Sequence, residues 1–247
     1  MQTTSSPTSP EPSQRSRSGR ALAIWVGISA LLIALAFAAT GSRGGDESRD
    51  ALFRYEFAIG SAAVYGVIIG IAWFAARGFG NPRGALGLRG FERRWIWITL
   101  GLTFLALVVS AALEPLLEAG EKQGLAPERW DDERAGAFAL NALVVVLLVP
   151  FAEELFYRGL GVRALAFLGP PAAIVGTAVA FAHAHGLLVG IPALGFFALA
   201  LAWVRWRTAS VWPGVISHSL YNGVGIAVAA YLARNPDEAP AALAFLL

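Results

Sequence analysis

The sequence predicts an all-α protein: a polytopic bundle of about seven transmembrane helices, or eight, with its N-terminus in the cytoplasm. Three observations support this fold class. The 247-residue chain is 56% hydrophobic and only 15% charged, whereas soluble domains carry about 25% charged residues. Several uncharged stretches have a length of about 20 residues, enough to cross ~30 Å of hydrocarbon. Basic residues are also spread unevenly over the segments between these stretches.

The predicted spans follow one another along the chain. The first, residues 21–40, is too long for the core of a signal peptide and lacks a small-residue cleavage site close behind it, so we expect a retained helix. Residues 1–20 before it are rich in Ser, Thr and Pro, which is typical of a disordered tail. The other candidate spans are residues 57–76, 95–113, 135–152, 170–186, 186–204 and 210–233.

We expect four segments and no second soluble domain. They are a cytoplasmic tail (1–20), a set of N-terminal transmembrane helices (21–130), a core that holds the unusual polar residues (131–233) and a C-terminal tail (234–247). Residues 239–247 are apolar but too short to span a bilayer. Whether they form an eighth membrane element at the interface stays open.

The basic residues indicate the orientation. Cytoplasmic loops carry excess Lys and Arg near helix ends. With the N-terminus inside, the inner segments hold 12 of the 19 basic residues, Arg158 and Arg163 among them, and the outer segments are strongly acidic. The slightly basic balance therefore reports topology and implies no nucleic-acid partner. The absence of cysteine excludes disulfides and thiolate nucleophiles.

The first unusual polar cluster is Glu153, Glu154 and Arg158, at the end of an uncharged run. An ionisable residue at the centre of a span costs about 2.5–3.5 kcal/mol on insertion scales and indicates a functional site. Glu154 and Arg158 are four residues apart and share a helix face, so they can pair. Glu153 points about 100° away and needs another partner. Pro150 is expected to loosen the backbone ladder. The alternative is a structural ion pair near the membrane surface.

Two further clusters contain all three histidines. Phe181 and His185 are four residues apart on one face, and His183 points to the opposite side. We expect one of these two histidines to be functional and the other incidental. His218 and Asn222 also share a face inside an apolar span, although an asparagine there can simply link helices.

The spacing brings these clusters together. If the helix that carries Glu153 continues to about Leu168, the chain turns at Gly169, and Glu153 and His185 lie at similar depths because each is 16 residues from that turn. His218 lies roughly 10–15 Å in from the neighbouring basic loop, at 1.5 Å per residue. Three helices are therefore predicted to line one pocket in the cytoplasmic half of the bilayer.

Such a pocket suits hydrolysis. A glutamate in a low-dielectric site can act as general base for water, and His218 with Asn222 can donate hydrogen bonds to a developing oxyanion. One Glu with two His also resembles a zinc-ligand set, although the H-E-x-x-H spacing is absent. The residues alone leave direct water activation and a metal both open.

The three clusters, in this order, resemble the CPBP family of intramembrane peptidases, which includes CAAX prenyl protease 2, the Abi proteins and lysostaphin-resistance protein A. The family pattern E-E-x-x-x-R, F-x-x-x-H, H-x-x-x-N/D is matched at the residues named above, within residues 135–225. The resemblance implies that Glu153 activates water with His185 and that His218 and Asn222 stabilise the oxyanion. Glu154 belongs to the same catalytic set. Arg158 and Phe181 support it.

The resemblance also implies a multi-pass protein of a prokaryotic plasma membrane that cleaves a membrane-associated peptide or protein. No cofactor is expected, and a divalent metal is not predicted. The substrate, its prenylation, the role of His183 and the oligomeric state cannot be inferred. Two other classes stay open: a non-catalytic immunity or scaffold protein of the same fold, and a small transporter. The complete set of site residues argues against the first, and the lack of internal repeats argues against the second.

Overall fold

A computed structural model of the chain describes residues 12–42, 50–117, 127 and 129–236, and every regular element in this part of the chain is helical. Six of its helices are long and apolar enough to cross a membrane. A seventh apolar helix, Pro170–His183, has 14 residues, or about 21 Å at 1.5 Å per residue. It is therefore too short to cross the hydrocarbon alone. Residues 239–247, the proposed eighth element, lie outside the described residues.

Helices form here because a bilayer offers no water to backbone N–H and C=O groups, so a spanning segment must satisfy them internally. The spanning elements are α1 (Pro12–Ser42), α2 (Tyr55–Ala76), α4 (Arg94–Leu117), the composite helix Ala135–Leu168, α10 (Ile191–Thr208) and α11 (Trp212–Arg234). Helix α1 begins before residue 21, so residues 12–20 of the predicted tail are helical, and residues 1–11 lie outside the described residues.

The composite helix is the most irregular element of the bundle. It consists of α6 (Ala135–Leu143), η3 (Val144–Leu148), α7 (Val149–Glu153), η4 (Glu154–Gly161), α8 (Val162–Leu165) and η5 (Ala166–Leu168), and both η3 and η4 are π-helical. The helix that carries Glu153 therefore continues to Leu168, as the spacing argument predicted, and extends beyond the uncharged span 135–152. Arg158 is fully buried.

Pro150 explains why the helix widens at η3. A proline has no N–H and its ring clashes with the carbonyl four residues earlier, and single π-helical turns are one way for a helix to absorb such a disturbance. The N–H of Val149 accordingly donates to Val144 O, five residues back. By the same register the carbonyl of Val145 would pair with residue 150, which has no N–H to give.

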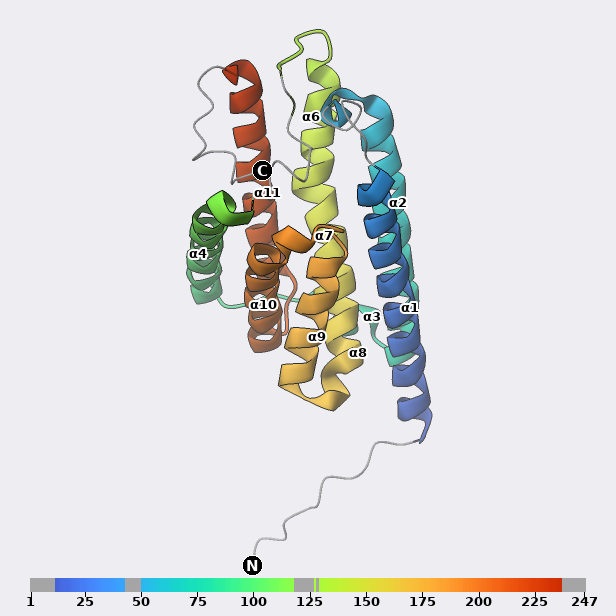
Figure 1. Ribbon diagram of the computed structural model, residues 1–247. Coiled ribbons are helices and arrows are strands. Elements are labelled where there is room, and N and C mark those ends of the chain that lie inside the picture. Colours follow the sequence, from blue (N-terminus) through green and yellow to red (C-terminus); the bar gives the residue numbers. More distant parts are fainter. Residues whose placement is uncertain (1–11, 43–49, 118–126, 128, 237–247) are drawn as a thin grey trace, which may run out of the picture.

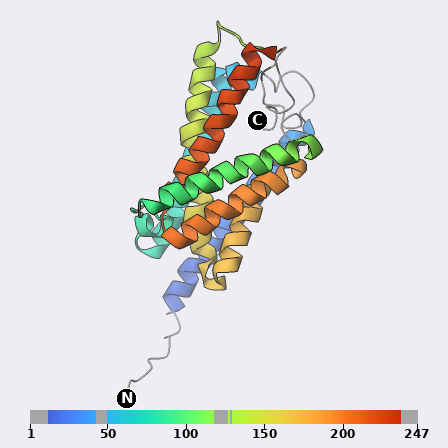
Figure 2. The ribbon, with the colours of Figure 1, turned by 90° about the vertical axis from the view of Figure 1, so that its left-hand side faces the viewer.

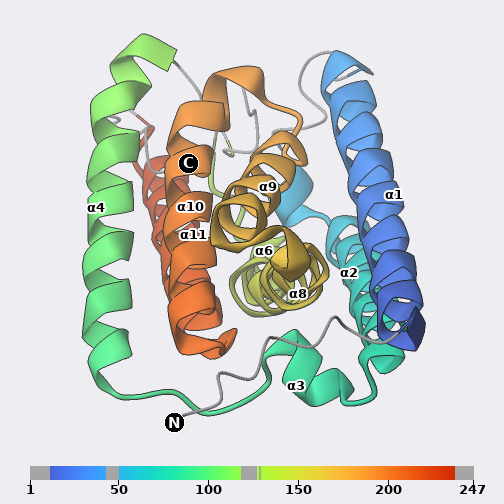
Figure 3. The same ribbon diagram turned by 90° about the horizontal axis from the view of Figure 1, so that it is seen from below.

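The composite helix runs through the middle of the bundle. Helices α1 and α2 lie on one side of it and α10, α11 and α4 on the other (Figure 1). Helices α4 and α10 lie side by side and are inclined to α6 and α11 (Figure 2). Seen from below, α9 (Pro170–His183) and α8 occupy the centre between the two outer groups (Figure 3). The buried core thus surrounds the segment that carries Glu153, Glu154 and Arg158.

The turn predicted at Gly169 is confirmed. Gly169 has φ 90°, a conformation that residues with a Cβ rarely adopt, and Pro170 starts α9 with the φ that a first helical turn requires. Helix α9 then returns along η4 and α8. His185 follows the end of α9, so the antiparallel arrangement inferred from the spacing is present.

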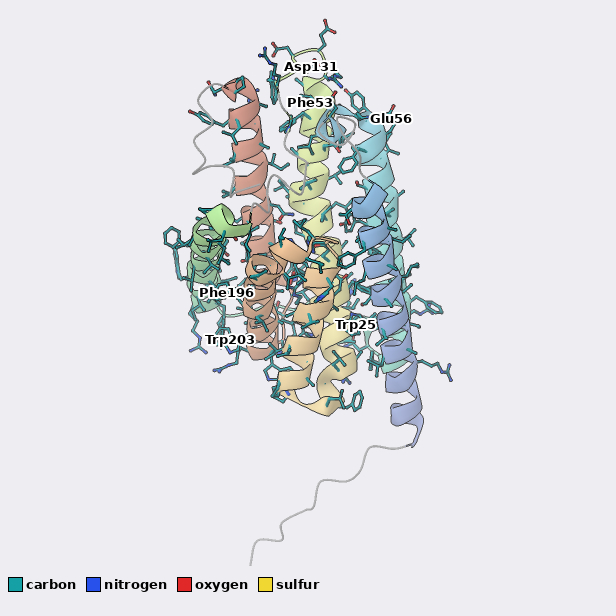
Figure 4. The ribbon with its side chains drawn as sticks, in the orientation of Figure 1. Trp25, Phe53, Glu56, Asp131, Phe196 and Trp203 are labelled. Atoms are coloured by element: carbon teal, nitrogen blue, oxygen red, sulfur yellow. The ribbon has the colours of Figure 1, made fainter. Side chains whose placement is uncertain are left out.

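Short elements close the two ends of the bundle. At the end where α1 begins, η2 (Arg77–Phe79) leads into α3 (Pro82–Leu86), where the buried Arg205 guanidinium fills the space beside Gly87 and donates to Ala85 O at 3.5 Å. At the opposite end, η1 (Ala51–Phe53) precedes α2, and Phe53 packs against Trp130 with ring centroids 5.4 Å apart. Figure 4 shows Phe53 and Asp131 at that far end and Trp25 pointing into the bundle. The element η6 (Leu188–Gly190) links α9 to α10.

Candidate active site

The charged cluster lies at the junction of α7 and η4, in the middle of the composite helix. Glu153 is the last residue of α7 and Glu154 the first of η4. Wide π-helical turns occur preferentially at functional sites. In this structure both carboxylates lie on the inner side of the helix at the wide turn, as shown by their contacts with His218 on α11.

Glu154 and Arg158 form the predicted ion pair, which is confirmed. Arg158 Nη1 lies 3.0 Å from Glu154 Oε1, and both side chains are 0% exposed. The guanidinium also stacks on the ring of Phe181 at 4.2 Å and donates through Nη2 to Ala198 O at 3.3 Å. A buried charge is tolerated only when it is paired and hydrogen-bonded, so this pair fixes η4 against α9 and α10.

Glu153 points away from that pair, as the helical geometry predicted. Its Oε1 accepts a hydrogen bond of 3.0 Å from the Tyr65 hydroxyl on α2. Its Oε2 is buried, has no hydrogen-bond partner among the described residues and lies 3.7 Å from His218 Nε2. A gap of that size between two polar groups is one that a bridging water can fill.

His218 lies between the two carboxylates. Its Nδ1 is 3.3 Å from Glu154 Oε1, while its Nε2 faces Glu153. The ring is almost completely buried, with its centroid 5.6 Å from those of Phe181 and Phe197. Glu154 thus holds one nitrogen of the ring, and the other is directed to the free oxygen of Glu153.

Small residues of α11 allow this helix to pack closely against these groups. Gly214, in its first turn, is buried beside Glu154, and a Cβ at that position would lie 2.5 Å from Glu154 Oε2. One turn further, the hydroxyls of Ser217 and Thr103 hydrogen-bond and join α11 to α4. The position of His218 therefore depends on contacts with two neighbouring helices.

His185 adjoins the cluster through Phe181. The two rings are 4.7 Å apart, and the carbonyl of Phe181 lies 2.9 Å from His185 Nδ1, which makes Nδ1 the donor and leaves Nε2 as the acceptor nitrogen. Within the part of the chain that the structure describes, no hydrogen bond or ion pair links His185 to Glu153. His183, which the sequence places on the other side, bonds to Val179 O of its own helix.

Asn222 does not join the carboxylate cluster in the structure. Its Nδ2 donates to Val145 O at 3.0 Å. This is the carbonyl in η3 whose π-helical partner would be Pro150. The asparagine amide therefore replaces the backbone donor that the proline lacks, and it ties α11 to the composite helix. Its predicted role at an oxyanion stays a prediction.

Two residues at the site are absent from the sequence-based set. Tyr65 lies ten residues into the span Tyr55–Phe79, away from the interfacial positions where membrane tyrosines usually gather, and this was the available signal. Gly214 follows Pro213 in a helix-start pattern, and nothing in that pattern indicates a carboxylate beside it.

The site residues do not form a metal-ligand set as they are placed. Among the described residues, no group of three or more His, Asp and Glu side chains is arranged to hold a metal ion. The nearest approach is the one imidazole of His218 between two carboxylates. We therefore derive no step through a metal.

The fold and the site define a multi-pass helical membrane protein with a buried cluster of two carboxylates, an arginine and a histidine. Residues 135–224 match the family model described as Type II CAAX prenyl endopeptidase Rce1-like. This match confirms the resemblance to the CPBP family, and because that family is one of proteases it supports peptidase activity. The matched segment contains every predicted site residue, whereas Tyr65 lies outside it. Searches of curated proteins and of solved structures found no match.

A first prediction concerns Gly214. Replacement by alanine puts a methyl group into the space of the Glu154 carboxylate, so we expect destabilisation by about 1–3 kcal/mol, as for other overpacked interiors. The thermal midpoint of the detergent-purified protein should fall. The matched control is Gly223→Ala in the same helix, where the new methyl group meets Val146 at an ordinary 3.7 Å. Equal midpoints for the two variants would contradict the close fit at Glu154.

A second prediction concerns Asn222. Asn222→Ala leaves the Val145 carbonyl without a donor, which should cost about 1–3 kcal/mol. In a Pro150→Ala background the backbone N–H of residue 150 becomes available to that carbonyl, so the same substitution should cost less there. Thermal midpoints of the four proteins form a double-mutant cycle. An equal cost in both backgrounds would rule out this account of the asparagine.

Proposed function

We propose that the protein is an intramembrane endopeptidase of the glutamate type, which hydrolyses a peptide bond with a water held between Glu153 and His218. The observation that carries this proposal is the 3.7 Å separation of Glu153 Oε2 from His218 Nε2, with the carboxylate oxygen buried and unpartnered in the described part of the chain. A base within reach of one water, in a site that excludes bulk solvent, is what general-base hydrolysis requires.

Charge balance supports the assignment of roles. Two carboxylates and one guanidinium leave one negative charge in a low-dielectric interior, where an uncompensated charge is costly. A protonated His218 removes it. In that form both ring nitrogens are donors, so Nδ1–H is directed to Glu154 and Nε2–H is free for an oxygen that gains negative charge. We infer that His218 is the oxyanion donor and Glu153 the base.

Hydrolysis by these residues needs water and no other reagent. Glu153 Oε2 takes a proton from water while the water oxygen bonds to the carbonyl carbon of the substrate. The carbonyl oxygen becomes the oxyanion and accepts from His218 Nε2–H. The carbon–nitrogen bond breaks next, and Glu153 returns its proton to the leaving amine. Glu154 and Arg158 change neither charge nor partner, because their role is to hold His218.

We assign His185 a direct part in the proposed reaction and Asn222 an indirect one. His185 has its Nε2 available as an acceptor, so it is suited to share the water with Glu153 once substrate is bound. Asn222 acts through the backbone of η3 and the position of α11. An oxyanion contact from Asn222 would require its amide to leave Val145, and the expected outcome of substitution there is loss of stability first.

The membrane orientation belongs to the same proposal. The start of α1, α3 and the turn at Gly169 lie at one end of the bundle (Figure 1), and this end carries the Arg-rich connections. We propose that it faces the cytoplasm of a prokaryotic cell, that the site lies in the cytoplasmic half of the plasma membrane, and that the substrate is a membrane-associated peptide or protein. Prenylation of the substrate is not required by any feature of the site.

The central test is cleavage of candidate membrane peptides by the purified protein. Glu153→Gln keeps the shape of the side chain and removes the base, so we expect a fall in kcat of about 10²- to 10⁴-fold. His183→Gln is the matched control, because among the described residues the His183 ring bonds to Val179 O of its own helix and to no carboxylate, and its kcat should equal that of the wild type. Wild-type cleavage rates from Glu153→Gln would disprove the proposed base.

The same assay separates the other functional classes. A scaffold or immunity protein would cleave none of the peptides drawn from its genomic neighbourhood, and a transporter would move a solute in vesicles in a manner that Glu153→Gln alters. No specific observation in the structure favours either class.

Metal dependence gives an independent prediction. Because the site residues do not form a ligand set, cleavage should persist after incubation with EDTA or 1,10-phenanthroline and dialysis. The measurement is kcat before and after chelation, with metal content determined by atomic emission. Loss of activity that zinc restores would show that the chemistry runs through a metal.

A further inference from the structure

Tyr65 contributes to the site from outside the segment that matches the family model. It lies on α2, and its hydroxyl donates to Glu153 Oε1 at 3.0 Å. Helix α2 packs directly on α7 and η4, with Ile68 and Ala72 buried in the core that also contains Leu155 and Phe156. The phenol is therefore presented by a packed helix that adjoins the residues bearing the two carboxylates.

The hydrogen bond distinguishes the two oxygens of Glu153. Oε1 is occupied by the phenol, while Oε2 is buried without a partner in the described residues and faces His218 Nε2. The terminal torsion of a glutamate is broad and roughly two-fold, so an unheld carboxylate rotates with little cost. A single donor at Oε1 is enough to restrict that rotation.

A more deeply buried tyrosine nearby shows that a hydroxyl alone does not produce this arrangement. Tyr157, on η4, packs its ring edge-on against Phe181 at 5.4 Å, and its hydroxyl has no hydrogen-bond partner among the described residues. Both tyrosines are enclosed by the same bundle, but only the Tyr65 hydroxyl bonds to Glu153. Tyr157 is therefore a suitable comparison for the effect of removing the Tyr65 hydroxyl.

We propose that Tyr65 is a positioning residue of the active site. Its hydroxyl holds Oε1 of Glu153 so that Oε2 stays directed at the water and His218, and α2 thereby completes a site whose other residues lie within residues 135–224. This inference rests on the proposed function, because it assigns Tyr65 a role in hydrolysis by Glu153. Tyr65 acts through Glu153 and does not touch the substrate.

The test compares Tyr65→Phe with Tyr157→Phe, each of which removes one hydroxyl and keeps the ring. Loss of a hydrogen bond to a charged group corresponds to about a 10- to 100-fold change, so kcat of Tyr65→Phe should fall by that factor with KM within about two-fold. Tyr157→Phe should retain wild-type kcat and KM. Both variants should show wild-type elution by size-exclusion chromatography in detergent, which checks that they fold.

A double-mutant cycle with Glu153→Gln separates positioning from a structural effect. If Tyr65 acts through the carboxylate, Tyr65→Phe should produce no further loss of kcat in the Glu153→Gln background. A loss of the same factor in both backgrounds, or equal rates for Tyr65→Phe and the wild type, would overturn the inference while leaving the function intact. If Glu153→Gln itself cleaves at the wild-type rate, the proposed function fails, and the role of Tyr65 fails with it.

Discussion

The buried ion pair of Glu154 and Arg158 is the interaction on which the rest of the site depends. Its two charges are fully removed from solvent, and loss of one partner of such a pair costs about 3–5 kcal/mol because the other is left uncompensated. Three neighbouring helices accommodate the pair. Phe181 of α9 gives the guanidinium a ring face, α10 gives it a carbonyl, and Gly214 of α11 leaves room for the carboxylate.

This arrangement explains why we propose different roles for the two adjacent glutamates. Glu154 has its charge balanced by Arg158 and its oxygen directed at His218. It is consequently unsuited to accept a proton, because protonation would leave the arginine unpaired in the interior. Glu153, one position earlier, accepts a hydrogen bond from the neutral Tyr65 phenol and lies 3.7 Å from His218, without a guanidinium of its own among the described residues. This difference is the reason for proposing Glu153, and not Glu154, as the base.

Much of the fold could be predicted from the sequence, because helical periodicity and the free-energy cost of a charge in the membrane decide where its elements lie. Uncharged runs identified six spans correctly but also a seventh, 170–186, whose helix is too short to cross. The four-residue spacing identified the pair Glu154–Arg158, and the Gly-Pro-Pro turn after Leu168 identified the antiparallel return of α9. Helix ends were less predictable. The uncharged run ends at residue 152, and only the spacing argument extended the helix past Arg158. The protein interior supplies a carboxylate, a ring and a carbonyl that remove the cost of burying this arginine.

Contacts between distant segments could not be predicted in the same way. Tyr65 is separated from Glu153 by 88 residues, and a single hydroxyl in an apolar run is compatible with many partners. The same holds for Asn222. Its spacing from His218 suggested that both side chains serve one ligand, but the π-helical turn at Pro150 exposes a carbonyl that competes for the amide. Recognising this requires the hydrogen-bond register of η3, which local composition does not specify.

The irregular helix also clarifies how a membrane interior can hold a cluster of charged side chains. In a regular helix the backbone N–H and C=O groups bond to one another, so none is left for a side chain of another helix to bind. The wide turns at η3 and η4 leave a carbonyl that Asn222 binds, and they place Glu153 and Glu154 so that both contact His218. Backbone irregularity in a membrane is tolerated only where the protein buries and re-satisfies it. Here α2, α9, α10 and α11 surround that segment. Helices α2, α9 and α11 contribute Tyr65, Phe181 and His218, and α10 contributes the Ala198 carbonyl and the Phe197 ring beside His218.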